Sequence, residues 1–173
     1  YMTSISLLAA IFVCSGQVHW EHPAGIVTAE TVSEVRERIQ TMDWAAGMVA
    51  SRKETLQRWL DIPSEELARV FPKTCGNVYH NFSCPDDRHR LTFDPFEPDT
   101  YTCPLCGKTY PADTDAGIYA KEDQYNGTMR DGWECLFYEQ AGAVAATLGL
   151  LGRLEPDGPR YSGRGVEILM LYA

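Results

Sequence analysis

The chain has 173 residues, of which 45% are hydrophobic and 23% are charged, so it has the composition of a globular protein and about the length of one domain. Its 24 acidic residues outnumber its 15 basic ones, which gives a net charge of −9. Repulsion at this charge disfavours nucleic acid, acidic membrane surfaces and polyanionic sugars as partners.

The two ends of the chain carry apolar runs. Ile5 to Val13 is too short to span a bilayer, and the small residues that follow it, up to Gly16, are typical of a signal peptide over residues 1–16. We therefore expect a secreted or periplasmic protein without stable membrane insertion. A buried first helix is the alternative, because no Lys or Arg precedes the apolar run. The run ending at Ala173 has no terminating residue, so we expect the protein to continue beyond it.

Residues 17–73 are predicted to form N-terminal helices. Thr28 or Thr31 is suited to cap the first helix, and Thr31 with Glu34 has the spacing of a capping box. A second helix is expected from Asp43 to Leu60, because Ile62-Pro63 stops it, and a short third one covers 64–71.

The segment 74–125 lacks helical periodicity and is rich in Pro, Asp, Gly and aromatic residues. Short extended runs are predicted at 91–93, 100–102 and 108–110. About fifty residues are too many for an unsupported loop in a compact domain. We therefore expect a stabilising element within this insertion.

The last segment, 126–173, is predicted to be a pair of helices. Apolar residues recur at helical spacing from Trp133 to Leu154, where Pro156 and Gly158 end the pattern. The residues from Tyr161 to Ala173 form the expected antiparallel partner. The fold class predicted from these segments is mainly α, with a small β-containing insertion.

A metal site is the strongest chemical signal in the sequence. Cys103-Pro-Leu-Cys106-Gly107 has the two-residue spacing that lets both thiolates face one ion, and the glycine relaxes the turn after them. Cys84 supplies a third thiolate, and His80, four residues earlier, completes a tetrahedral Cys3His set. Cys75 is the competing fourth ligand. Four protein ligands leave no open position for water, so we expect a structural zinc ion.

Disulfides are the alternative interpretation of these cysteines, because export places them in an oxidising compartment. Cys75 would then pair with Cys84, and Cys103 with Cys106. This reading explains the number of cysteines but not the Pro and Gly around Cys103 and Cys106. A redox Cys-x-x-Cys would also require a helix after it, which Pro111 prevents.

The sequence offers no persuasive catalytic set, whether a nucleophile with its base, a phosphate loop or paired carboxylates. The loop 125–133 is more notable, because it places polar, aromatic and basic groups before the long helix. In the simpler interpretation, Asp131 is a helix cap and Trp133 is a core anchor.

Three groups of residues resemble the N-terminal part of heparinase II/III-like polysaccharide lyases. The opening helices match at His22-Pro23, Thr28, Glu30, Arg36, Arg38-Ile39, Trp44-Ala45 and Trp59-Leu60. The insertion matches at His80, Cys84-Pro85, Leu91, Phe93-Asp94-Pro95 and the Cys103–Gly107 motif, and the last helices match at 133–154, Tyr161 and 168–173.

This resemblance implies an incomplete (α/α) toroid with a zinc-ribbon-like insertion, and an enzyme that cleaves an acidic, uronate-containing polysaccharide by β-elimination. The family's catalytic residues would lie beyond Ala173, so none is assigned here. The resemblance implies substrate contacts at Arg130, through charge, and at Trp133 and Tyr138, through stacking on sugars. A non-catalytic helical domain, with the zinc loop as a scaffold or carbohydrate-binding surface, is the alternative.

Overall fold

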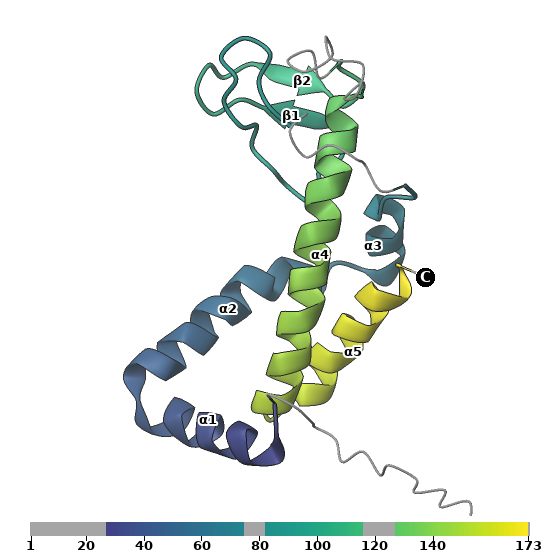
Figure 1. Cartoon of the computed structure of the whole chain (residues 1–173). Helices are drawn as coiled ribbons and strands as arrows, with labels where there is room; N and C mark the ends of the chain where they lie inside the picture. Colours follow the sequence, from purple (N-terminus) through teal and green to yellow (C-terminus); the bar gives the residue numbers. More distant parts are fainter. Residues whose placement is uncertain (1–26, 75–81, 116–126, 173) are drawn as a thin grey trace, which may run out of the picture.

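A computed structural model of the chain describes residues 27–74, 82–115 and 127–172. Within these ranges the fold is mainly helical, as predicted, with five helices and one antiparallel two-stranded sheet (Figure 1). The helices are α1 (Ala29–Thr41), α2 (Asp43–Asp61), α3 (Ser64–Val70), α4 (Met129–Leu154) and α5 (Gly158–Met170), and the strands are β1 (Thr100–Thr102) and β2 (Thr109–Pro111). The expected signal peptide lies outside the described residues.

Local signals set the helix ends. Thr28 caps α1 through a capping box in which Thr31, rather than Glu34, is the third helical residue. The stop expected at Ile62-Pro63 is confirmed, since α2 ends at Asp61. α4 begins four residues before Trp133, because Thr128 is its cap and the carboxylate of Asp131 accepts the N–H of Thr128 at 2.6 Å. The prediction that Asp131 itself is the cap was wrong, although it takes part in the capping box.

The two C-terminal helices form the expected antiparallel hairpin (Figure 1). α5 begins at Gly158, before the predicted start at Tyr161, and glycine is required there because a Cβ would lie 2.2 Å from the carbonyl oxygen of Gly152. Among the helices that the structure describes, α4 alone is long and apolar enough to cross a membrane. A core helix of a water-soluble protein meets the same criteria.

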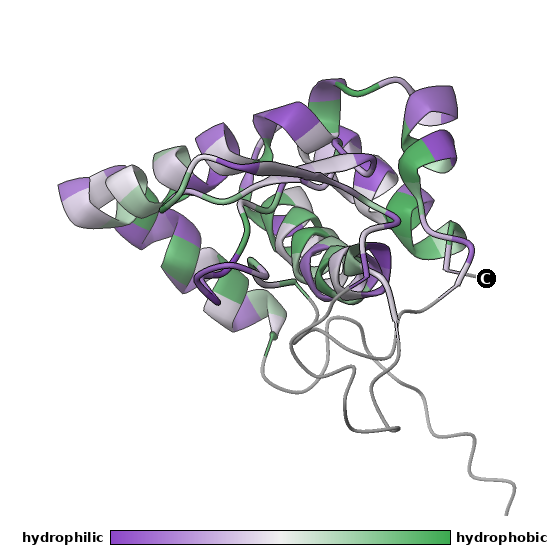
Figure 2. Cartoon of the chain, turned by 90° about the horizontal axis from the view of Figure 1, so that it is seen from above, coloured by the Kyte–Doolittle hydropathy of each residue, from purple (hydrophilic) through white to green (hydrophobic). Residues whose placement is uncertain are grey.

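The hydrophobic core lies along α4, where Figure 2 shows hydrophobic residues concentrated in the middle of the molecule. Phe137, fully buried on α4, contacts the rings of Trp59 on α2 and Phe71 after α3, with centroids 5.8 and 5.0 Å away. Tilted and edge-to-face arrangements of this kind stabilise aromatic pairs beyond their buried area. These contacts attach α2 and α3 to the central helix.

The segment 82–115 lies at the N-terminal end of α4 (Figure 1). The strands pair with Tyr101 opposite Tyr110, so the prediction for 100–102 is confirmed and the second strand lies one residue later than expected. No strand forms at 91–93; Arg90 makes an isolated bridge with Ser83 instead. The indole N–H of Trp133 donates to the carbonyl oxygen of Asp94 at 2.8 Å, which fastens this segment to α4.

Candidate metal centre

The first half of the site is a tight turn from Cys103 to Lys108. The N–H of Gly107 donates to the carbonyl oxygen of Cys103 at 2.9 Å, and the N–H of Cys103 donates to that of Lys108 at 2.8 Å. Gly107 has φ of +74°, a left-handed conformation that glycine adopts without steric cost. The predicted role of this glycine in the turn is therefore confirmed.

The second half of the site repeats this turn nineteen residues earlier, from Cys84 to His89. The N–H of Arg88 donates to the carbonyl oxygen of Cys84 at 2.8 Å, and the N–H of Cys84 donates to that of His89 at 2.7 Å. Arg88 has φ of +62°, where the later turn has its glycine. Since the two turns have the same hydrogen bonds, Asp87 occupies the position that Cys106 occupies in the other turn.

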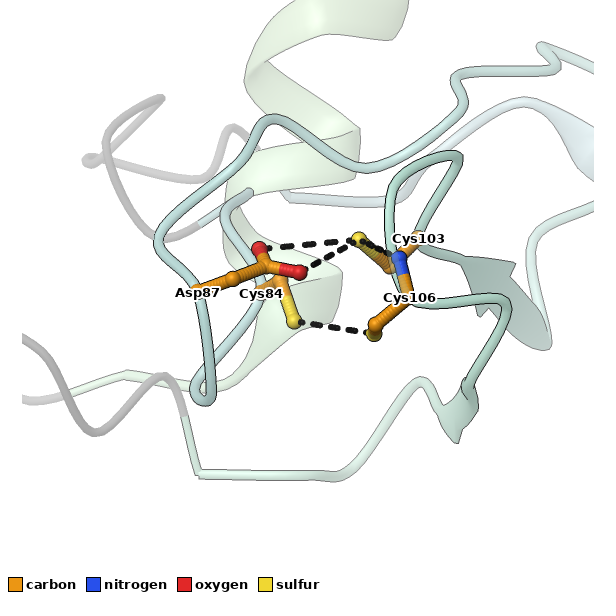
Figure 3. Close-up of side chains that lie close together, drawn as sticks. All are labelled: Cys84, Asp87, Cys103 and Cys106. Carbon is orange, nitrogen blue, oxygen red and sulfur yellow. Dashed lines mark hydrogen bonds between the residues drawn. The ribbon is translucent and has the colours of Figure 1, made fainter.

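The two turns bring four potential ligands together (Figure 3). One ligand atom from each of Cys84, Asp87, Cys103 and Cys106 lies within 4.8 Å of the others. The sulfurs of Cys84 and Cys106 are 3.8 Å apart, and Oδ2 of Asp87 is 3.3 Å from the sulfur of Cys103. Around a tetrahedral zinc ion with ordinary bond lengths, two sulfurs are about 3.8 Å apart and a sulfur and an oxygen about 3.5 Å.

The surroundings of the thiols affect their protonation. Burial raises the pKa of Cys84, but hydrogen bonds from the Tyr110 hydroxyl and from backbone N–H groups outweigh it, so this pKa lies below its ordinary value. Burial raises the pKa of Cys103 to about 11. The N–H of His89 donates to Oδ1 of Asp87 at 2.8 Å and lowers the pKa of that carboxyl group. Asp87 is therefore ionised at neutral pH, as a metal ligand must be.

A second layer of polar groups surrounds Cys84. The hydroxyl of Tyr110 lies 3.1 Å from the Cys84 sulfur and 3.1 Å from Oδ2 of Asp86. Lys108 pairs with the same Asp86 oxygen at 2.5 Å and lowers the pKa of that carboxyl group. Hydrogen bonds of this kind orient metal ligands and adjust their basicity.

Three of the four predicted metal ligands, Cys84, Cys103 and Cys106, are thus brought together. All three thiols are free, so the alternative of a disulfide between Cys103 and Cys106 is not what the structure shows. The predicted fourth ligand His80 and its competitor Cys75 lie outside the described residues. Asp87 was not among the predicted ligands, although Cys84-Pro-Asp-Asp87 repeats the pattern Cys103-Pro-Leu-Cys106 and could have indicated it.

The residues expected to contact sugars do not form one exposed surface. Trp133 is 1% exposed, so it has no free face for stacking and is the core anchor of the simpler interpretation. The hydroxyl of Tyr138 donates to the carbonyl oxygen of Pro72, and its ring packs on Phe71. Arg130 pairs with Asp99 at 2.8 Å beside a cavity of about 700 Å³. This cavity mixes both charges, with basic residues Arg69, Lys73 and Arg130 and acidic residues Glu66, Glu97, Asp99 and Glu134.

Comparison of the chain with protein families, with curated protein sequences and with solved structures finds no match.

Proposed function

We propose that the chain binds one structural Zn²⁺ ion through Cys84, Cys103 and Cys106, and that this ion holds the segment 82–115 in its fold. The observation that carries the proposal is the convergence of three thiols from two matching turns, with sulfurs of Cys84 and Cys106 at the spacing of a tetrahedral site. Soft thiolates in a tetrahedral arrangement favour zinc among the common divalent ions.

The composition of the segment 82–115 supports a structural role. Its buried side chains are few and belong to Phe82, Cys84, Leu91, Pro95, Tyr101, Cys103 and Ala112. Two of these seven are metal-ligand candidates, and the segment contains only a two-stranded sheet of three residues per strand. Two strands alone are marginally stable in water, so cross-linking both turns through one ion supplies the missing stability.

The test is the metal content of the full chain, purified without added metal and measured by elemental analysis, together with a count of reactive thiols before and after chelation. We expect about one zinc ion per chain, and we expect Cys84, Cys103 and Cys106 to become reactive when the metal is removed. Cys135→Ser is the matched control, because Cys135 lies on α4 and is not part of the cluster. A chain without metal, or one whose metal survives Cys103→Ser, contradicts the proposal.

We propose as a second candidate that the chain is the N-terminal portion of an exported polysaccharide lyase that acts on uronate-containing polysaccharide by β-elimination, located outside the cell or in the periplasm. The incomplete toroid and the zinc-ribbon-like insertion belong to this proposal. Its support is the residue resemblance and the cavity beside Arg130, where cationic side chains are available to a uronate carboxylate. The carboxylates in the same cavity favour the non-catalytic scaffold instead.

Binding of a uronate polysaccharide separates the lyase proposal from a non-catalytic scaffold that binds no carbohydrate. Isothermal titration of the metal-loaded chain with alginate and with heparin should show binding that weakens in Arg130→Ala if the lyase proposal is right. Binding to neither polysaccharide favours the scaffold. The chain alone is expected to be inactive in either case, because no catalytic set is assigned within it.

A further inference from the structure

The repeated turn gives Asp87 a defined position relative to the ion. Each turn begins with a cysteine and has its second inward-pointing side chain three residues later, which is Cys106 in one turn and Asp87 in the other. The backbone hydrogen bonds of the two turns match, and each turn is flanked by an antiparallel pair, Ser83 with Arg90 and Thr102 with Thr109. The site is therefore a pair of equivalent turns with one sulfur ligand replaced by a carboxylate.

The side chain of Asp87 is held in place for this role. Its Oδ1 accepts the N–H of His89 at 2.8 Å, and its Oδ2 is the oxygen nearest the Cys103 sulfur. In Figure 3 the carboxylate points toward the three thiols rather than away into solvent. Asp86 differs, because its carboxylate pairs with Lys108 and is not part of the cluster.

We propose that Asp87 is the fourth protein ligand of the ion and that its oxygen determines which metals the site prefers. This inference rests on the proposed metal binding. Oxygen is a harder ligand than a thiolate, so replacing one of four sulfurs by a carboxylate weakens the binding of soft ions such as Cd²⁺ more than that of Zn²⁺. A Cys3Asp site is thus selective for Zn²⁺ in comparison with the four-thiolate site that the repeated motif would otherwise form.

The experiment compares Asp87→Cys and Asp87→Asn in the full chain, using competition with a chromophoric chelator to measure the affinities for Zn²⁺ and Cd²⁺ alone. We expect Asp87→Cys to raise the ratio of Cd²⁺ to Zn²⁺ affinity by about tenfold or more, and Asp87→Asn to weaken Zn²⁺ binding by at least about tenfold. Asp99→Asn is the matched control, because Asp99 carries the same charge but pairs with Arg130 outside the cluster.

Cobalt provides a second readout. The sulfur-to-metal charge-transfer absorption of bound Co²⁺ increases with the number of thiolate ligands, so it should be stronger in Asp87→Cys than in the parent chain and unchanged in Asp99→Asn. If the parent chain binds no metal, the proposed function itself fails. A different result overturns only the assignment of Asp87 and leaves the metal site standing. In that result the parent chain binds zinc, both Asp87 variants keep the parent's metal affinities, and His80→Ala loses them.

Discussion

Replacement of Cys103 by Ser is the sharpest test of the structural role. The Cys103 side chain is fully buried between the two turns, and the N–H of Cys106 points at its sulfur at 3.5 Å. An ion that binds only the folded chain stabilises it by about 2.7 kcal/mol when free metal is a hundred times the dissociation constant. For a chain of this length, loss of that amount lowers the melting temperature by about 5–11 °C. We expect Cys103→Ser to lose this increment.

The structure indicates which signals should change. Phe93 and Phe96, in the segment 82–115, lie against Trp133 and Trp59, with ring centroids 6.1 and 4.9 Å apart. Loosening of this segment should therefore shift tryptophan fluorescence. The helical circular dichroism signal should change little below the melting transition, because the α4–α5 hairpin has contacts of its own.

The assay is thermal unfolding with and without zinc, followed by both signals. The parent chain and Cys135→Ser should gain stability on zinc addition, and Cys103→Ser should not. Equal gains in all three proteins would refute the reasoning that the ion stabilises the fold through Cys103.

Three further substitutions test separate parts of the structure. Burial raises the pKa of the Glu134 carboxyl group in the folded chain. Above this raised pKa the buried charge destabilises the fold, whereas below the ordinary pKa of 4.5 the group is protonated in both the folded and the unfolded chain and the penalty disappears. Glu134→Gln should therefore melt at a higher temperature than the parent at pH 7 and not at pH 4, and an equal gain at both pH values would contradict this. Arg88 has φ of +62°, a left-handed conformation that is strained for a residue with a side chain. Arg88→Gly should therefore stabilise the zinc-loaded chain against urea by about 0.5–1 kcal/mol, which is the strain relieved minus the conformational entropy that glycine loses on folding. A loss of stability would show that the Arg88 side chain contributes more than the strain. Tyr110→Phe removes the hydroxyl beside the Cys84 sulfur and should weaken zinc binding about 10–100-fold in chelator competition. Unchanged affinity would mean that this hydroxyl does not act on the ligand.

The helices could be predicted from the sequence because their limits are local. Ile62-Pro63 ends α2, and the apolar repeat over residues 133–154 follows the buried face of α4. The position of Cys103 and Cys106 was also predictable, since the spacing, Pro104 and Gly107 all act within one turn. These signals depend on neighbours along the chain, which the sequence displays directly.

The missed features depend on contacts between distant segments. Asp87 joins the site because its turn has the same backbone hydrogen bonds as the later one, and Arg88 takes the left-handed conformation without a glycine to indicate it. The sequence favoured a core position for Trp133 over an exposed stacking position but could not identify its partner, because the indole N–H donates to the carbonyl oxygen of Asp94, 39 residues away. Burial of Glu134 beside Thr74 likewise follows from packing that no local pattern indicates.

The turn at Asp94 connects the candidate metal centre to the helical core. Its carboxylate pairs with Arg58 of α2 at 2.5 Å, and its carbonyl oxygen accepts the indole N–H of Trp133 on α4. The guanidinium of Arg58 also lies 4.6 Å from the centre of the Phe96 ring, which packs in turn on Trp59. An ion that orders the two cysteine turns therefore also fixes the segment between them, which contacts both α2 and α4. We therefore expect binding of the proposed ion to stabilise the packing of α2 on α4 as well as the insertion itself, because Arg58 of α2 and Trp133 of α4 both contact Asp94 of this segment.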